Sequence, residues 1–312
     1  MKRDLHGSDE SLEVVPLRHY GRWIAAAAAI AALVGLVGSL AKNDNLRWTV
    51  VGDYLFAGLI FDGLATTLWL TVAAMALGLG LGTVIAVMRL SSSPILYGMS
   101  SLFVWAFRGT PLLVQIIFWG YAAALYSQIK IGVPFTDITF VSWDTNSVLT
   151  PTVAALLALG LNEAAYASEI VRAGIQSVDP GQAEAGHSLG MRPALTMRRI
   201  VLPQAMRVII PPMGNETINM LKMTALVSII GAHDLMSNIQ EVYAQNYQVI
   251  PMLVVASLWY LALVSLLSIP QAWLERRYGR GTTRSQSSSV IQRMLGSAST
   301  TLARRTKKEA GR

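Results

Sequence analysis

Long runs of residues without a charged side chain dominate the pattern of this chain. There are 19 such residues at 23–41, 26 at 63–88 and 33 at 242–274. About 20 apolar residues in a helix cross the hydrocarbon core of a bilayer, so each run is long enough for a membrane span. A large soluble helical protein is the alternative, but its core helices would carry a polar stripe. The pattern therefore predicts an all-α integral membrane protein.

Six transmembrane helices are expected, with polar segments between them. They cover 23–41, 63–88, 97–127, 149–173, 204–231 and 251–274. Loops are expected at 42–62, 128–148, 174–203 and 232–250. The first apolar run ends in Ser39-Leu40-Ala41, which also fits a signal-peptide cleavage site. However, the polar segment that precedes the run is long for a signal peptide, and further spans follow it, which favours a retained helix.

Two of the expected spans contain residues with special packing or backbone properties. Gly78 and Gly82 lie four positions apart in an apolar run with no lysine following, which favours close helix–helix packing over phosphate binding. The third span is interrupted by residues that should break or kink a helix. These residues are Arg108, Gly109, Thr110 and Pro111.

The distribution of charge predicts how the chain is oriented in the membrane. Only 14% of the residues are charged, against about 25% in soluble domains. Lys and Arg number four in residues 1–22, five in 172–207 and ten in 276–312, whereas the loop expected before the last span has none. The positive-inside rule therefore places both termini and the loop 174–203 in the cytoplasm. The basic tail fits contact with anionic lipid better than nucleic-acid binding.

The expected cytoplasmic loop contains residues that begin and end short helices. Asp179 is suited to an N-cap and Pro180 to the first helical position. Gly190 is placed to end that helix in a left-handed conformation. Pro193 then begins a second short helix, and Pro203 closes the unit before the membrane resumes. Such a helix–turn–helix element favours a docking site for another protein over an ordinary solvated loop.

The same loop resembles the signature loop of permease subunits in bacterial ABC importers, which reads Glu-Ala-X, three residues, Gly, nine residues, Ile-X-Leu-Pro. The matching residues are Glu184, Ala185, Gly186, Gly190, Ile200, Leu202 and Pro203. Gly186 is the one departure, because alanine is usual there. The blocks 107–115 and 165–175 are similar to the polar amino acid branch, the histidine/glutamine-type permeases, which have five spans.

The resemblance implies a division of the chain and a set of partners. The segments would be a cytoplasmic tail (1–22), an added span (23–41), the permease domain (63–277) and a basic disordered tail (278–312). The short helix of the loop would dock into an ATP-binding cassette ATPase subunit. A second permease copy or a paralogue would complete the pathway, and an extracytoplasmic solute-binding protein would deliver amino acids or similar small polar solutes at the bacterial inner membrane.

The chain itself is not expected to be an enzyme. It contains no Gly-x-x-x-x-Gly-Lys-Ser/Thr phosphate loop, so ATP and magnesium would be bound by the partner subunit. The four histidines are too scattered to form a metal site. No nucleophile–base pair or carboxylate pair indicates a catalytic site.

Polar side chains at membrane depth are candidates for the solute pathway, because an ionisable group there needs a partner or a wet cavity. The candidates are Asn162, Glu163, Asn215, Glu216, Asn219 and Lys222. In the fifth expected span Asn215, Asn219 and Lys222 share one helical face, with Glu216 about 100° away. A structural network of hydrogen bonds and ion pairs is the alternative.

Three charged residues near the ends of spans are expected to have structural roles, and two other functions remain as alternatives. Arg108 and the pair Glu169 and Arg172 are expected near the cytoplasmic ends of their spans, where they would orient and pack the helices. A secondary transporter driven by an ion gradient would need intramembrane acids but no docking loop, and it usually shows an inverted repeat. A membrane-embedded enzyme would need His, Asp and Glu clustered at one membrane face.

Overall fold

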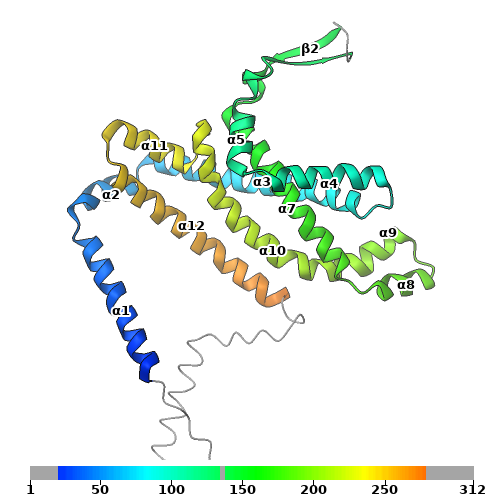
Figure 1. Ribbon diagram of the computed structural model, residues 1–312, viewed down its shortest axis with the longest axis horizontal. Helices are drawn as coiled ribbons and strands as arrows, with labels where there is room; N and C mark the ends of the chain where they lie inside the picture. The colour runs from blue at the N-terminus through cyan, green and yellow to red at the C-terminus, as the bar shows by residue number, and fades with distance from the viewer. Residues whose placement is uncertain (1–19, 134–137, 279–312) are drawn as a thin grey trace, which may run out of the picture.

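The computed structural model describes residues 20–133 and 138–278, which are almost entirely helical (Figure 1). Of the two expected tails, all but residues 20–22 and 278 lie outside the described residues. In chain order the elements, with η3 a π-helical turn and the other η elements 3-10 helices, are α1 (Tyr20–Ala41), η1 (Asp44–Leu46), α2 (Trp48–Leu55), α3 (Gly58–Arg89), α4 (Pro94–Gly109), α5 (Leu112–Gly120), η2 (Ala122–Ala124), β1 (Gln128–Gly132), β2 (Thr139–Asp144), α6 (Thr145–Val148), α7 (Pro151–Gln176), α8 (Pro180–Ser188), α9 (Pro193–Thr196), η3 (Met197–Val201), α10 (Leu202–Met223), η4 (Thr224–Ile230), α11 (Leu235–Asn246) and α12 (Val249–Tyr278).

Within the described ranges, four helices are long and apolar enough to cross a membrane: α1, α3, α7 and α12. Helices α4 and α5 make a fifth span if the pair is taken as one helix bent by 99°. The span expected at 204–231 is divided between α10 and η4, and α10 lacks the apolar character of the other four. The all-α membrane fold is therefore confirmed, while the count of six spans stays a prediction.

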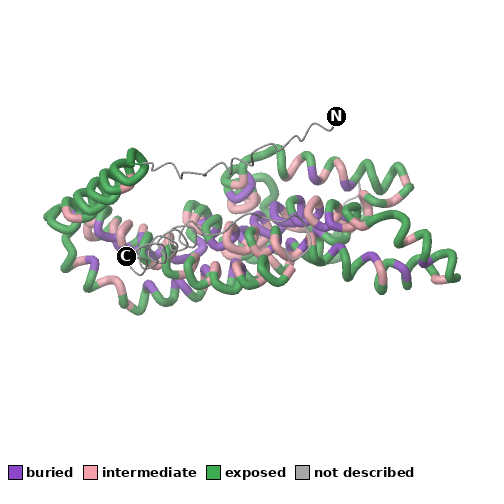
Figure 2. Tube along the Cα trace, turned by 90° about the horizontal axis from the view of Figure 1, so that it is seen from below, coloured by how far each residue is buried: buried purple, intermediate pink, exposed green. Residues whose placement is uncertain are grey.

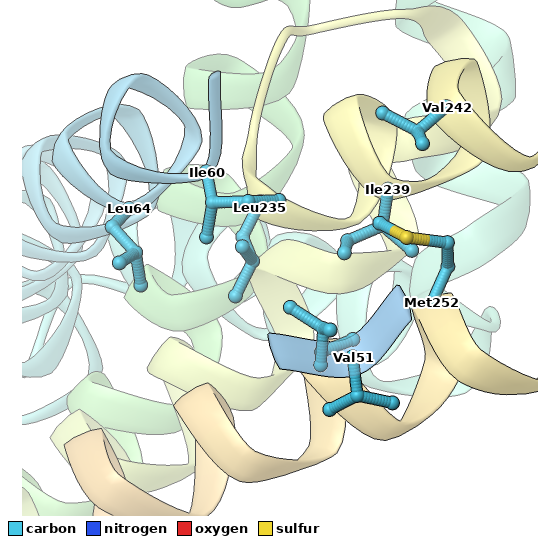
Figure 3. Packing of buried hydrophobic residues seen from close by; sticks show 9 residues of the cluster. Val51, Ile60, Leu64, Leu235, Ile239, Val242 and Met252 are labelled. Atoms are coloured by element: carbon cyan, nitrogen blue, oxygen red, sulfur yellow. The ribbon is translucent and has the colours of Figure 1, made fainter. Parts of the chain in front are cut away.

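Three segments expected as loops contain regular structure. The segment 42–62 includes α2, 128–148 includes a β-hairpin, and 232–250 includes α11. Helices α2 and α11 are short and amphipathic, so they leave no long uncharged run in the sequence. They bury apolar side chains against α3 and α12 in the cluster that Figure 3 shows, formed by Val51, Ile60, Leu64, Leu235, Ile239, Val242, Met252, Val255 and Ala256.

Helix α1 stands apart from the other helices (Figure 1), and none of its residues is buried. Figure 2 shows it as exposed along nearly its whole length. The added N-terminal span expected at 23–41 is therefore helical, and it begins three residues earlier than expected. Its apolar side chains face outward on all sides, as they do in a helix that is surrounded by lipid.

Helices α3 and α7 cross closely through small residues, as the sequence predicts. A Cβ atom added at Gly82 would lie 2.8 Å from Ala167 Cβ and 2.9 Å from the Ala164 carbonyl oxygen. Gly78 lies directly against Glu163 in the same crossing. Without side chains at these two positions, the backbones of α3 and α7 can approach each other.

Replacing Gly82 with leucine should therefore separate α3 from α7 and lower the stability of the folded protein. Overpacking of a tight contact costs about 1–3 kcal/mol. Gly80 provides the matched control, because it is exposed and a Cβ there would meet nothing within 4 Å. Thermal unfolding of the detergent-purified proteins should show a lower midpoint for Gly82→Leu than for Gly80→Leu. Equal midpoints would contradict the proposed role of this crossing.

Candidate functional site

The expected cytoplasmic loop folds as two short helical segments joined by a tight turn. Asp179 caps α8, with its Oδ1 accepting a hydrogen bond of 2.7 Å from the Gly181 amide, and Pro180 occupies the first helical turn. Gly190 ends the helix with φ = +77°, and its amide donates to the His187 carbonyl at 2.9 Å. The three predicted boundary residues of this helix are thus confirmed.

The second helical segment begins at Pro193, as predicted, but it does not end at Pro203. Helix α9 runs through one π-helical turn (η3) directly into α10. Pro203 lies directly after this π-helical turn, inside the continuous helical segment, and does not end it. The unit is therefore continuous with α10, the helix that carries four of the predicted pathway residues.

The two segments pack against each other through Gly186, which is buried. A Cβ at this position would lie 3.0 Å from Ile200 Cδ1 and 3.1 Å from Thr196 Cγ2, so glycine allows a close contact where alanine is usual. Glu184 and Ala185 are exposed on α8. Leu189, at the turn, is 83% exposed. Leu189 was not among the residues predicted for this site, although an apolar side chain in a polar loop was a usable signal.

The break between α4 and α5 is confirmed at the predicted residues, and polar side chains stabilise it. The Gln115 side-chain amide donates to the Phe107 carbonyl at 2.9 Å and to Thr110 Oγ1 at 2.9 Å. Asn162 Nδ2 donates to the same Phe107 carbonyl at 3.1 Å and to Gln115 Oε1 at 3.3 Å. The carbonyl that the bend leaves without a helical partner is therefore satisfied. Asn162 takes part in a structural network here, and its role in a pathway stays a prediction.

Charged residues join the end of α3 to the last turns of α7. Glu169 Oε2 accepts hydrogen bonds from Arg172 at 2.6 and 3.1 Å, and Glu169 Oε1 pairs with Arg89. Arg172 also donates to Gln176 Oε1 at 2.6 Å. This arrangement fits the predicted orienting role, and it adds Arg89, which sequence reasoning did not connect to it. Arg108 lies elsewhere, 4.9 Å from the centre of the Tyr166 ring.

Two acidic side chains of the predicted pathway lie together between α7 and α10. Glu163 is 3% exposed, and its Oε1 has no hydrogen-bond partner among the described residues. Glu216 is half-buried and close enough to Glu163 for the two carboxyl groups to interact electrostatically. Asn219 donates a hydrogen bond to Glu216.

The other two members of the predicted stripe, Asn215 and Lys222, are exposed. In the part of the chain that the structure describes, neither Glu163 nor Glu216 forms an ion pair. Glu163, Glu216 and Asn219 thus bring together two carboxyl groups and one amide, and no basic side chain among the described residues forms an ion pair with either carboxyl group. Such a group of acceptors can bind a cationic solute.

Comparisons with known proteins show which family this chain resembles over most of its length. Residues 78–280 match the family described as binding-protein-dependent transport system inner membrane component. The chain is 44% identical over 274 residues to the arginine transport system permease protein ArgU of Corynebacterium glutamicum, covering 88% of this chain and 85% of ArgU. It is 36% identical over 243 residues to the L-cystine transport system permease protein TcyB of Bacillus subtilis, covering 78% of this chain and 95% of TcyB.

Similar solved structures include one titled "Crystal structure of an amino acid ABC transporter with histidines". Its matched chain is 35% identical, with a TM-score of 0.59, and the match covers 70% of this chain and 94% of that one. A bacterial ABC transporter for the import of alginate matches with a TM-score of 0.52 at 12% identity, which shows a shared fold alone.

Proposed function

This chain belongs to the family of binding-protein-dependent transport system inner membrane components, and from that premise we propose that it is the permease of an ATP-driven importer for cationic amino acids. Membership makes the chain a membrane transport component of an amino acid ABC importer and not an enzyme itself. The observation that carries the choice of cargo is the pair of carboxyl groups at Glu163 and Glu216, neither of which has an ion-pair partner within the described residues.

The cargo follows from charge. Carboxylates inside a membrane protein are costly unless they are matched by a cation, and the guanidinium of arginine offers paired donors to a carboxylate. The similarity to ArgU, named as an arginine transport permease, supports the same class. L-arginine is therefore the first cargo to test.

ATP binding and hydrolysis are assigned to a separate subunit that docks on α8 and the turn after it. Glu184, Ala185 and Leu189 are exposed on this element, and the packing of Gly186 on Ile200 holds it to the second segment. Because that segment continues into α10, a displacement of the docking element would move Glu216 and Asn219 as well. ATP and magnesium would be held by the partner subunit.

The remaining partners and the orientation belong to the same proposal. A second copy of this chain or a paralogue would complete the pathway, and a solute-binding protein would deliver cargo from outside the bilayer. Both termini lie in the cytoplasm in this arrangement, with the basic residues at the ends of α3 and α12 on that side. Lipid surrounds the exposed apolar sides of the helices.

Uptake into proteoliposomes tests the proposal against a secondary transporter. The permease, its ATPase subunits and its solute-binding protein would be reconstituted, and uptake of labelled L-arginine would be measured. We expect uptake to require internal ATP and to persist when a protonophore collapses the proton gradient at clamped ATP. Uptake that needs the gradient and not ATP would support the ion-driven alternative and overturn the proposed function.

A further inference from the structure

A β-hairpin extends from the helices beyond α5. Strand β1 pairs with β2 in antiparallel register, with Gln128 opposite Asp144 and Ile131 opposite Val141. Figure 1 shows the hairpin well clear of the helices, on the far side of the molecule from α8 and from the C-terminal end of α12. Since α8 and the end of α12 are assigned to the cytoplasmic side, the hairpin lies on the outer side.

The base of the hairpin is held by specific contacts. The Thr145 amide donates to the Ser127 carbonyl at 3.0 Å, and its hydroxyl donates to the Tyr126 carbonyl. Asp144 caps α6 by accepting from the Asn146 amide at 2.9 Å. These contacts therefore hold the base of the hairpin in one orientation.

The hairpin has one apolar and one polar face. Because side chains alternate along a strand, the opposed pairs Ile129–Trp143 and Ile131–Val141 share one face. Ile131 is 55%, Val141 44% and Trp143 43% exposed, so the chain itself leaves about half of the surface of these side chains uncovered. The opposite face carries the pairs Gln128–Asp144 and Lys130–Ser142, and the exposed Phe140 lies outside both sets of pairs, at the register shift between Val141 and Thr139.

Lipid does not explain the apolar face. Within the described residues the sheet has two strands only, so each strand keeps one unpaired edge. Lipid-exposed sheet edges do not occur in the hydrocarbon core, because their amide and carbonyl groups would lack hydrogen-bond partners. Lys130 and Asp144 are the charged residues of the two strands, and their opposite charges give no attraction to anionic headgroups. The hairpin is therefore placed outside the hydrocarbon core.

We propose that the apolar face of the hairpin, formed by Ile129, Ile131, Val141 and Trp143, is a docking surface for the solute-binding protein of the importer. The inference rests on the proposed function and names the surface that receives this partner. An isolated two-stranded hairpin is only marginally stable in water, so covering its apolar face stabilises it. Solute-binding proteins approach from the outer side, where the hairpin lies clear of the helices (Figure 1).

Photo-crosslinking in the assembled importer tests which molecule covers this face. Benzoylphenylalanine would replace Val141 on the apolar face or Ser142 on the polar face, in the full complex in nanodiscs with purified solute-binding protein loaded with L-arginine. We expect crosslinks to the binding protein from position 141 and at least several-fold fewer from position 142. Crosslinks from position 141 to a second permease copy or to lipid, or equal yields from both positions, would overturn the proposal.

A kinetic measurement separates docking from folding and from the proposed function. With Trp143→Ser, the binding-protein concentration that half-maximally stimulates ATP hydrolysis should rise about tenfold or more, since buried aromatic side chains dominate interface energies. Basal ATP hydrolysis should not change, and Gln128→Ser on the polar face should behave like the native protein. An unchanged half-maximal concentration for Trp143→Ser would refute the docking surface. If the native complex itself showed no ATP-dependent arginine uptake, the proposed function would fail instead.

Discussion

Uptake should be lost when Glu184 is replaced by lysine, although the permease should still insert in the membrane. Glu184 is exposed on α8, whereas Gly186 on the same helix faces inward against the second segment. Docking of the ATPase subunit would bury this carboxylate against the partner. Disrupting one member of a buried interface charge pair costs about 2–5 kcal/mol, so a fall in ATP-driven uptake of about 30-fold or more is expected.

Gln182→Lys is the matched control for this prediction. Gln182 is also exposed on α8, but at 100° per residue it lies about 160° around the helix from Glu184. It should retain most uptake and should still co-purify with the ATPase subunit, whereas Glu184→Lys should lose the subunit during purification. Native uptake by the Glu184→Lys protein would show that this residue does not couple ATP hydrolysis to transport.

Features set by local chemistry could be predicted from the sequence. Asp179, Pro180 and Gly190 define α8 because caps act through the backbone groups of their immediate neighbours. The bend before Pro111 follows in the same way, since proline cannot continue the hydrogen bonding of the preceding turn. The close crossing at Gly82 was also foreseen, because the missing side chain is itself the signal.

Features that depend on distant partners could not be predicted. The sequence shows that Glu169 is acidic, but only the fold brings it to Arg89 at the end of α3. Asn162 and Glu163 are adjacent in sequence, yet the first points to the α4–α5 bend and the second to α3 and α10. Neighbours in a helix differ by about 100° in direction, so they meet different helices.

The continuity of α9 with α10 shows the limit of reading proline as a boundary. The sequence predicts that Pro203 closes the cytoplasmic unit, but the chain passes through a π-helical turn just before this proline and continues as α10. The consequence is mechanical. The docking element is joined to Glu216 by one continuous helix, and the interior prolines Pro211 and Pro212 lie between the two, where a kink can form.

Replacing Glu216 with glutamine should weaken the uptake of L-arginine much more than it weakens the fold. Glutamine keeps the size of the side chain and can still accept a hydrogen bond from Asn219. It removes the negative charge that would attract a cationic solute. Hydrogen bonds to charged groups contribute about 1.5–3 kcal/mol, so the arginine concentration for half-maximal uptake should rise about 10- to 100-fold.

Lys222→Gln provides the control, because it removes a charge from an exposed position farther along α10. Its arginine uptake and thermal unfolding midpoint should stay close to those of the native permease. If Glu216 serves only a structural network, Glu216→Gln should lower the unfolding midpoint and leave the half-maximal arginine concentration unchanged. A pathway role requires the opposite pattern, because the charge then matters to the solute and not to the packing of α7 on α10.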